Sequence, residues 1–78
     1  MPHVTFYAAA RAAAGVSRAE IDGSTLSSLV KNLEHSYPAL GPVLPGCSYL
    51  LNGVACKDLD STLTSADNVD ILPRFAGG

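Results

Sequence analysis

A single amphipathic helix limits the folds open to this chain. Four apolar residues follow the spacing i, i+3, i+4 and i+7, which places them on one face of a helix: Leu26, Leu29, Val30 and Leu33. One such stripe can cover only one face of a sheet. The strand-like segments around the helix are therefore expected to form one sheet that is covered on one side, as in a two-layer α+β domain.

The residues that flank this helix predict where it begins and ends. The hydroxyl group of Ser24 or Thr25 can accept a hydrogen bond from a free backbone N–H of the first turn. Pro38 disfavours helical geometry at Tyr37, so the helix is expected to end near that residue. Residues 38–46 contain three prolines and two glycines, and they are expected to form a loop that crosses the domain.

Two short strands are expected before the helix. Residues 3–9 alternate with the period of a strand, and the residues on one of its faces are Val4, Phe6 and Ala8. Residues 10–15 suit a short helical turn closed by Gly15. Residues 16–21 alternate more weakly and are assigned partly by position, and Asp22-Gly23 ends this second strand as a turn.

A β-hairpin is the clearest local signal in the second half of the chain. Asn52-Gly53 separates the apolar runs 47–51 and 54–57, which is typical of a type I′ turn, because both turn positions need a positive φ. In this register Cys47 and Cys56 are diagonal neighbours, about 7–8 Å apart at Cα. That separation exceeds ordinary disulfide geometry, so two reduced, partly buried thiols are expected.

The last strand is expected at Val69–Leu72. Its nearly continuous apolar character suits a strand paired on both sides, lying beside and parallel to the first strand, and Pro73 ends it. Residues 59–68 before it are polar and rich in turn-forming residues, with Leu59 and Leu63 expected to reach the core. Tyr7, Tyr49 and Leu51 are candidates for the uncovered sheet face, where half-buried strand positions and interface positions are both open readings.

Composition excludes several classes of function. The 78 residues carry a net charge of −2 with scattered basic residues, which argues against nucleic acid as a ligand. Hydrophobic residues make up 47% of the chain, against the low hydrophobicity of disordered proteins. No apolar run approaches the roughly 20 residues of a membrane span, and no cysteine and histidine spacing suits zinc. A cytoplasmic protein without a signal peptide, bound metal or membrane contact is expected.

The C-terminal residues carry the predicted chemistry. The chain runs Arg74-Phe75-Ala76-Gly77-Gly78 after the last strand, and this segment extends at most about 16–18 Å. Gly77 and Gly78 lack Cβ atoms, so they can pass through a narrow channel of another protein. A terminal carboxylate is inert until it is activated, most simply as an acyl-adenylate formed from ATP. Sulfide could then convert it to a thiocarboxylate, whose sulfur is nucleophilic.

Several motifs together resemble the MoaD/ThiS family of β-grasp, ubiquitin-like sulfur carriers, and within it the MoaD branch, the small subunits of molybdopterin synthase. The resemblance covers essentially all 78 residues, and its motifs are Val4–Arg11, Tyr37-Pro38, Asn52-Gly53, Asp67–Pro73 and Phe75–Gly78. It implies a β-grasp domain over residues 1–73, with a mixed sheet of about five strands and one main helix on one face. It also implies a flexible diglycine tail over residues 74–78.

The resemblance also implies partner proteins, one of which uses ATP. A MoeB-type enzyme would use ATP to adenylate Gly78, and a sulfurtransferase would supply the sulfur of the thiocarboxylate. The charged carrier would then insert its tail into a MoaE-type large subunit, within a heterotetramer of two small and two large subunits. There the sulfur would enter cyclic pyranopterin monophosphate during molybdenum cofactor biosynthesis. The carrier itself would bind no cofactor, and the acid and base groups would belong to the large subunit.

The expected site residues are therefore Gly78, which carries the adenylate and then the thiocarboxylate, and the partner-binding residues Arg74, Phe75, Ala76 and Gly77. Phe75 is expected to anchor in a partner groove, with packing on its own sheet as the alternative. Arg74 departs from the neutral residue of many relatives. It either meets an acidic group of a partner or is solvated, and solvation is the favoured reading.

Other functions use the same tail chemistry. A sulfur carrier for thiamine-thiazole or cysteine synthesis would activate its C-terminal glycine in the same way. A ubiquitin-like modifier would instead join that glycine to lysine side chains through an isopeptide bond. An interaction module whose tail takes part in no reaction is the fourth reading.

Overall fold

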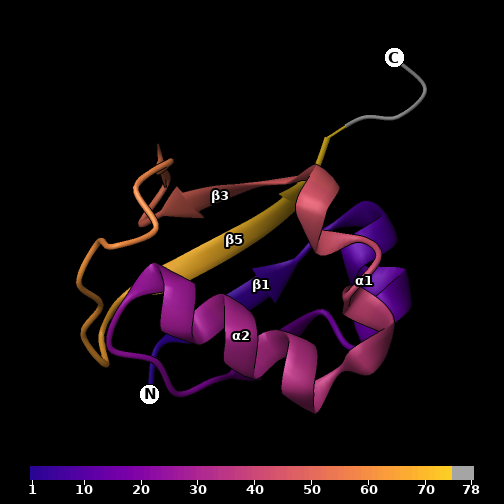
Figure 1. The fold of residues 1–78 in the computed structure, drawn as a ribbon, viewed down its shortest axis with the longest axis horizontal. Coiled ribbons are helices and arrows are strands. Elements are labelled where there is room, and N and C mark those ends of the chain that lie inside the picture. Colours follow the sequence, from indigo (N-terminus) through magenta and orange to yellow (C-terminus); the bar gives the residue numbers. More distant parts are fainter. Residues whose placement is uncertain (75–78) are drawn as a thin grey trace.

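A computed structural model describes residues 1–74 of the chain, and Phe75–Gly78 lie outside the described residues. Within residues 1–74, one mixed sheet has the strand order β2-β1-β5-β3-β4. Figure 1 shows α2 lying across one face of this sheet, with α1 at one end. The strands are β1 (His3–Phe6), β2 (Arg18–Glu20), β3 (Cys47–Leu51), β4 (Val54–Ala55) and β5 (Asn68–Pro73); the helices are α1 (Ala8–Ala14), α2 (Leu26–Ser36) and the 3₁₀ turns η1 (Pro38–Leu40) and η2 (Leu44–Gly46).

The last strand occupies the centre of the sheet, as predicted. β5 pairs parallel with β1 and antiparallel with β3, and its residues Val69 and Ile71 are fully buried. Neighbouring β1 buries Val4 and Phe6 on the same face. A strand with partners on both sides satisfies all its backbone groups inside the sheet, which explains why this segment can be so apolar.

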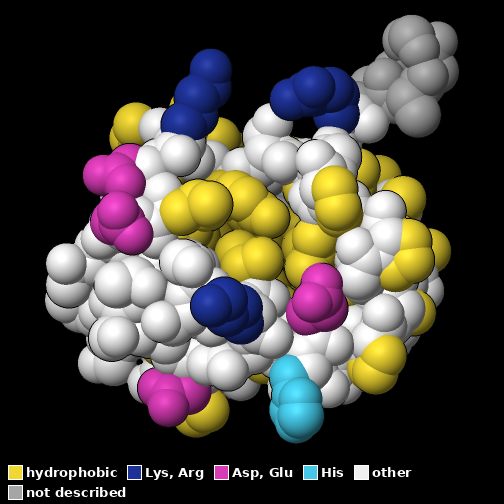
Figure 2. Space-filling view, in the orientation of Figure 1, with side chains coloured by type: hydrophobic (Ala, Val, Ile, Leu, Met, Phe, Trp, Pro, Cys, Tyr) yellow, Lys and Arg dark blue, Asp and Glu magenta, His cyan; other side chains and the backbone are white. Residues whose placement is uncertain are grey.

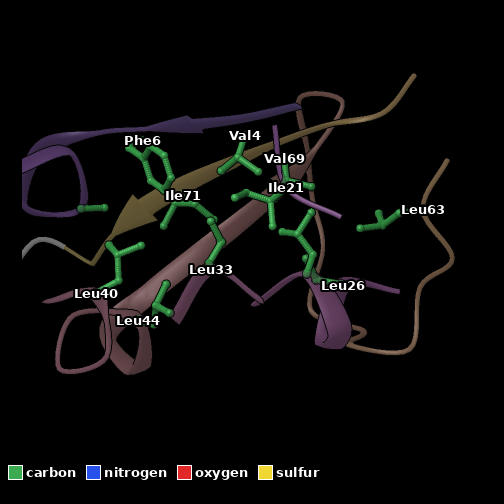
Figure 3. Packing of buried hydrophobic residues seen from close by; sticks show 12 residues of the cluster. Val4, Phe6, Ile21, Leu26, Leu33, Leu40, Leu44, Leu63, Val69 and Ile71 are labelled. Atoms are coloured by element: carbon green, nitrogen blue, oxygen red, sulfur yellow. The ribbon is translucent and has the colours of Figure 1, made fainter. Parts of the chain in front are cut away.

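The predicted apolar stripe of α2 forms the other half of the core. Leu26, Leu29 and Leu33 are buried against the sheet, whereas Val30 is only half-buried at the edge of the helix. Figure 3 shows the side chains of α2 and the sheet pointing toward one another between the two layers. At the C-terminal end of α2, the ring of Phe6 meets the ring of Tyr37 edge-on, with the ring centroids 5.8 Å apart.

Both ends of α2 agree with the sequence prediction. The Thr25 side chain accepts a hydrogen bond from the Ser28 N–H at 3.1 Å, and the helix ends at Ser36, immediately before Tyr37 and Pro38. Two further N–H groups of the first turn donate to the carbonyls of Ser61 and Leu59, at 3.0 and 2.8 Å. The irregular segment before β5 therefore completes the cap of α2.

The first predicted strand is too long. β1 ends at Phe6, and Ala8, predicted to lie on the strand face, instead begins α1 with a φ of 50°. Tyr7 still donates to the Ile71 carbonyl at 3.2 Å, so the chain leaves the sheet directly after that contact. The helical turn after it, predicted over residues 10–15, is confirmed: α1 buries Ala10, and Gly15 closes it in the left-handed conformation.

The second strand and the proline-rich loop also differ in detail from the prediction. β2 covers only Arg18–Glu20, and Ile21 beyond it is buried. The loop 38–46 consists of η1 and η2, which insert Leu40 and Leu44 into the core. Short 3₁₀ turns tolerate the prolines that exclude an α-helix and still bring one leucine from each turn inward.

The Asn52-Gly53 hairpin is confirmed, although its second strand is shorter than predicted. Both turn residues have positive φ, 50° and 84°, and Leu51 faces Val54 as expected. β4 ends at Ala55, so β3 and β4 pair only at Leu50 and Leu51, while Cys47 pairs with Pro73 of β5 on the other edge of β3. The Cys56 N–H still donates to the Tyr49 carbonyl at 2.9 Å.

Two predictions about apolar side chains are wrong. Leu63 is buried as expected, but the Leu59 side chain is 48% exposed. Tyr49 and Leu51 do not lie on the uncovered sheet face, because they pair with Ile71 and Val69 and pack against the core cluster on the helix side; the alternative reading, half-buried strand positions, is confirmed for both. Side chains alternate along a strand, so their assignment to a face follows from the register, which the sequence alone did not fix.

The turn between β3 and β4 is tied to the start of β5 through side chains. Asn52 donates to the Asp67 carboxylate at 2.9 Å and accepts from the Asn68 N–H at 2.9 Å. The second Asp67 oxygen accepts from the Thr64 N–H at 2.7 Å. These hydrogen bonds, the one from Asn52 first, hold the pKa of Asp67 below its ordinary value of 3.8.

Replacing Gly23 is expected to destabilise the fold. A Cβ atom added there would lie 2.7 Å from the Cα of Leu29, so α2 would have to move away from the strand that precedes it. Gly23→Ala should lower the free energy of unfolding by about 1–3 kcal/mol in urea titrations. Gly46→Ala is the matched control, because a Cβ atom there meets open space. Equal stability of the two variants would contradict this packing.

Asp67 is expected to make stability depend on pH. Its lowered pKa means that the carboxylate stabilises the fold above pH 3.8, and that this contribution is lost as pH falls through the lower folded pKa. Asp67→Asn should therefore destabilise the protein in urea titrations at neutral pH and have a smaller effect in acid. Asp60→Asn, at an exposed carboxylate outside this network, serves as the control. An effect of Asp67→Asn that does not change with pH would contradict the prediction.

Candidate functional site

The position of Arg74, the last residue that the structure describes, is fixed by the backbone of β5. Pro73 pairs with Cys47 at the start of β3, and the Arg74 N–H donates to the Gly46 carbonyl at 2.6 Å. Because β5 is central, it is held on both sides along most of its length. The residues after Arg74 therefore begin at a defined point, beside η2 at one end of the sheet (Figure 1).

Arg74 is the one predicted site residue that the structure describes, and its side chain is exposed. Phe75, Ala76, Gly77 and Gly78 lie outside the described residues, so their predicted roles stay predictions. The division into a domain over 1–73 and a tail over 74–78 stays a prediction too. Arg74 lines a depression together with residues of β3, β4 and the segment that follows β4, among them Tyr49, Cys56 and Leu59.

The two cysteines near this point are free and half-buried, as the sequence predicted. The Cys47 Sγ donates to the Val43 carbonyl at 3.3 Å, and the Cys56 Sγ lies 3.3 Å from the Ser61 hydroxyl. Burial raises the pKa of Cys47 above 9.0, so its thiol stays protonated at neutral pH. A protonated thiol is a poor nucleophile, which favours a structural role for Cys47.

Tyr49 lies between the tail exit and α2 and is also uncharged at neutral pH. Burial is the largest cause of its raised pKa, followed by the negative charges that Cys47 and Glu34 carry when ionised. A neutral phenol presents an aromatic face and one hydroxyl group. The depression beside Arg74 therefore combines uncharged side chains, Tyr49 among them, with the basic side chains of Lys57 and Arg74.

The opposite face of the sheet is polar. A broad concave surface over β2, β1 and β5 is lined by side chains of both charges, among them His3, Arg18, Glu20 and Asp70. Asn68 donates to the Asp70 carboxylate at 2.9 Å in the middle of this surface. The sequence pattern had placed Tyr7, Tyr49 and Leu51 here; Tyr7 does line this surface, whereas the register turns Tyr49 and Leu51 to the helix side.

Sequence reasoning did not find the depression beside Arg74, because its lining comes from separate parts of the chain. The one local signal was Leu59, an apolar residue in a polar segment, which was assigned to the core. Among residues 1–74, no group of three or more histidine, cysteine or acidic residues could hold a metal ion. In the same residues, no helix combines the length and apolar character that crossing a membrane requires.

Comparison with known families gives one match. The model of the ThiS family matches residues 4–78, which is almost the whole chain and includes both terminal glycines. Comparison with curated protein sequences gives no significant match.

Solved structures give close matches in fold. Small archaeal modifier protein 1 from Methanosarcina acetivorans is 26% identical, with a TM-score of 0.89 over 99% of this chain and 95% of that protein. A chain of the BexX/CysO complex from Amycolatopsis orientalis is 19% identical, with a TM-score of 0.83 over 100% of both chains. A chain of the complex of subunits 1 and 2 of the molybdopterin-converting factor from Helicobacter pylori is 21% identical, with a TM-score of 0.74 over 99% of this chain and 97% of that one.

Proposed function

Because the chain belongs to the ThiS family of ubiquitin-like sulfur carriers, we propose that Gly78 supplies the carboxyl group that carries the sulfur. The observation that carries this proposal is the family match itself, which runs through the terminal diglycine. The defined exit of β5 supports it, because strand pairing and the bond from Arg74 to Gly46 hold the origin of the last residues in place. The folded domain presents the tail, and partner enzymes supply the chemistry.

Activation would proceed in two steps. A carboxylate oxygen of Gly78 attacks the α-phosphorus of ATP, pyrophosphate leaves, and an acyl-adenylate forms on an enzyme of the MoeB type. Hydrosulfide, provided by a sulfurtransferase, then attacks the acyl carbon, AMP leaves and a thiocarboxylate remains. Gly77 and Gly78 suit an enclosed active site because they have no side chains to exclude. Tethering to a docked domain raises the effective concentration of the reacting group.

We propose molybdopterin synthesis as the pathway. The thiocarboxylate would donate its sulfur to cyclic pyranopterin monophosphate inside a MoaE-type large subunit, in a heterotetramer. The motifs quoted above, with Phe75-Ala76 before the diglycine, support this choice through their resemblance to MoaD. The similarity in fold to a chain of a two-subunit molybdopterin-converting factor is consistent with it. A carrier for cysteine or thiamine-thiazole synthesis would share both activation steps and would differ only in the molecule that accepts the sulfur.

A protein modifier is the second candidate function. Small archaeal modifier protein 1 combines a TM-score of 0.89 with 26% identity over nearly the full length of both chains. In this function a lysine amine, in place of hydrosulfide, would displace AMP and form an isopeptide bond. A ladder of high-mass conjugates in a blot against the carrier, lost when Gly78 is deleted, would favour the modifier over the sulfur carrier.

Changes at Gly78 are expected to abolish activation and leave the fold intact. Deletion of Gly78, or Gly78→Leu, should lower pyrophosphate release with the purified cognate adenylating enzyme by at least about 100-fold, because the reacting carboxylate is misplaced. Asp60→Asn, at an exposed side chain, should retain the wild-type rate.

Thermal unfolding of the same variants provides the second measurement. The melting temperature should match that of the wild type, since Gly78 is expected to contribute no core contact. A loss of stability as large as that of a core mutation would mean that the tail is structural, and normal pyrophosphate release without Gly78 would refute the proposed site.

A further inference from the structure

The turn between β3 and β4 contains a dipeptide that can react with itself in water. Asparagine is one of the thermally labile residues of proteins. Among the three asparagines of the chain, Asn52 alone is followed by a glycine; a leucine follows Asn32 and a valine follows Asn68. The backbone nitrogen of Gly53 can attack the Asn52 side chain with little hindrance, because glycine has no Cβ atom. Spontaneous deamidation is therefore chemically easiest at this turn.

The reaction has two steps and consumes only water. The Gly53 nitrogen forms a bond to the Asn52 Cγ atom, the side-chain amide leaves as ammonia with the proton of the Gly53 N–H, and a five-membered succinimide ring results. Water then adds to one of the two ring carbonyls and breaks its bond to nitrogen. One choice gives aspartate at position 52, and the other gives isoaspartate, in which the main chain runs through Cγ.

The folded turn holds the backbone of Asn52 in a conformation that cannot close this ring. Its φ of 50° is left-handed. The ψ of about +47° that accompanies this conformation places the Gly53 nitrogen nearly trans to the Asn52 Cβ atom. The succinimide is a nearly flat ring that contains both atoms, so its formation needs them eclipsed. The turn must therefore leave the left-handed conformation before the reaction can begin.

The Asn52 side chain is also held at the start of β5. Its amide group donates to the Asp67 carboxylate at 2.9 Å, and its oxygen accepts from the Asn68 N–H at 2.9 Å. The Asn52 backbone N–H donates to the Asn68 carbonyl at 2.8 Å, and the Thr64 N–H fixes the second oxygen of Asp67 at 2.7 Å. Opening of the turn breaks these bonds around Asn52, so they determine how often the reactive conformation occurs.

The turn is open to water and separate from the larger hollows of the surface. Asn52 and Gly53 are both exposed. Figure 2 shows hydrophobic side chains gathered in a hollow on the helix side, and the residues that line the depressions there do not include either turn residue. The polar surface on the opposite face of the sheet does not include them either. Exposed hydrogen bonds with few apolar contacts around them belong to the parts of a protein that open locally.

We propose that Asn52 is a site of spontaneous deamidation, and that local opening of the turn from Asp67 and Asn68 sets its rate. The product then loosens the turn further. A carboxylate at position 52 cannot donate to Asp67, and two carboxylates would face each other where the amide nitrogen and the Asp67 oxygen now lie 2.9 Å apart. Gly78 takes no part in this reaction, so the inference is independent of the proposed function.

The test is peptide mapping by mass spectrometry of the purified full chain, incubated at neutral pH either folded or unfolded in urea. Deamidation at Asn52 should be at least about tenfold slower in the folded protein, because only the open fraction reacts. Asn32 and Asn68 are internal controls in the same samples. In urea they should react far more slowly than Asn52, since the side chain of the next residue hinders attack.

The variant Asp67→Ala separates local opening from unfolding of the whole domain. It removes the partner of the Asn52 amide and should raise the deamidation rate of the folded protein about tenfold, as loss of a hydrogen bond to a charged group shifts an opening equilibrium. Asp60→Ala, at an exposed carboxylate outside these contacts, should keep the wild-type rate within about twofold. Leu33→Ala weakens the core away from the turn. At a temperature where it stays folded, its rate should remain near that of the wild type.

Two further measurements need neither Asp67→Ala nor the waiting time of the reaction. In hydrogen exchange of the wild type, the Asn68 N–H should exchange faster than the slowest amides of the domain, because it opens with the turn. Asn52→Asp reproduces one product and should lower the free energy of unfolding at neutral pH, with a smaller loss in acid, where the two carboxylates are protonated.

The inference has definite contrary outcomes. Equal deamidation rates in the folded wild type and in urea would show that the turn gives Asn52 no protection. Acceleration by Leu33→Ala as large as that by Asp67→Ala, or exchange of the Asn68 N–H as slow as that of the slowest amides, would make global unfolding the route and overturn local opening. Wild-type stability of Asn52→Asp would overturn the claim that the product loosens the turn.

Discussion

The position of β5 between β1 and β3 is the constraint on which the rest of the structure depends. Val69 and Ile71 are fully buried because the strand is paired on both edges and covered by α2 on one face. This pairing places Pro73 and Arg74 beside Cys47 and Gly46. It also determines that Tyr49, opposite Ile71, faces the helix layer and lines the depression beside Arg74.

In the function that we propose, the folded domain presents the end of the chain, and the end of the chain carries the sulfur. The buried core contains hydrophobic side chains alone within residues 1–74, and burial keeps the Cys47 thiol protonated. These properties suit a rigid body that presents a reactive group and has no part in the chemical steps. Membership of the ThiS family agrees with that arrangement, because such a carrier brings its reactive end to the enzymes that use it.

Much of this fold could be predicted because its strongest signals are local. The α2 stripe, the Thr25 cap and the positive φ values of Asn52-Gly53 each depend on residues close together in the sequence.

The predictions that failed concern residues whose positions depend on tertiary contacts. Leu59 was placed in the core because it is an apolar residue in a polar segment. In the structure its carbonyl accepts a hydrogen bond from the first turn of α2, and its side chain lies at the surface. Residues 8 and 9 extend a strand pattern, yet the chain turns into α1 at Ala8. Of the predicted site residues, the structure describes Arg74. The depression beside Arg74 was not predicted, because its lining residues come from distant parts of the chain.

The central claim is that sulfur is carried at Gly78, and fragmentation of the intact protein in a mass spectrometer tests it most directly. After incubation with the adenylating enzyme, ATP and a sulfur source, the protein should gain the mass difference between one sulfur atom and one oxygen atom. Fragments that contain Gly78 should carry this gain, and fragments that contain only Cys47 or Cys56 should not. Added sulfur on either cysteine, with an unchanged C-terminal fragment, would contradict the account.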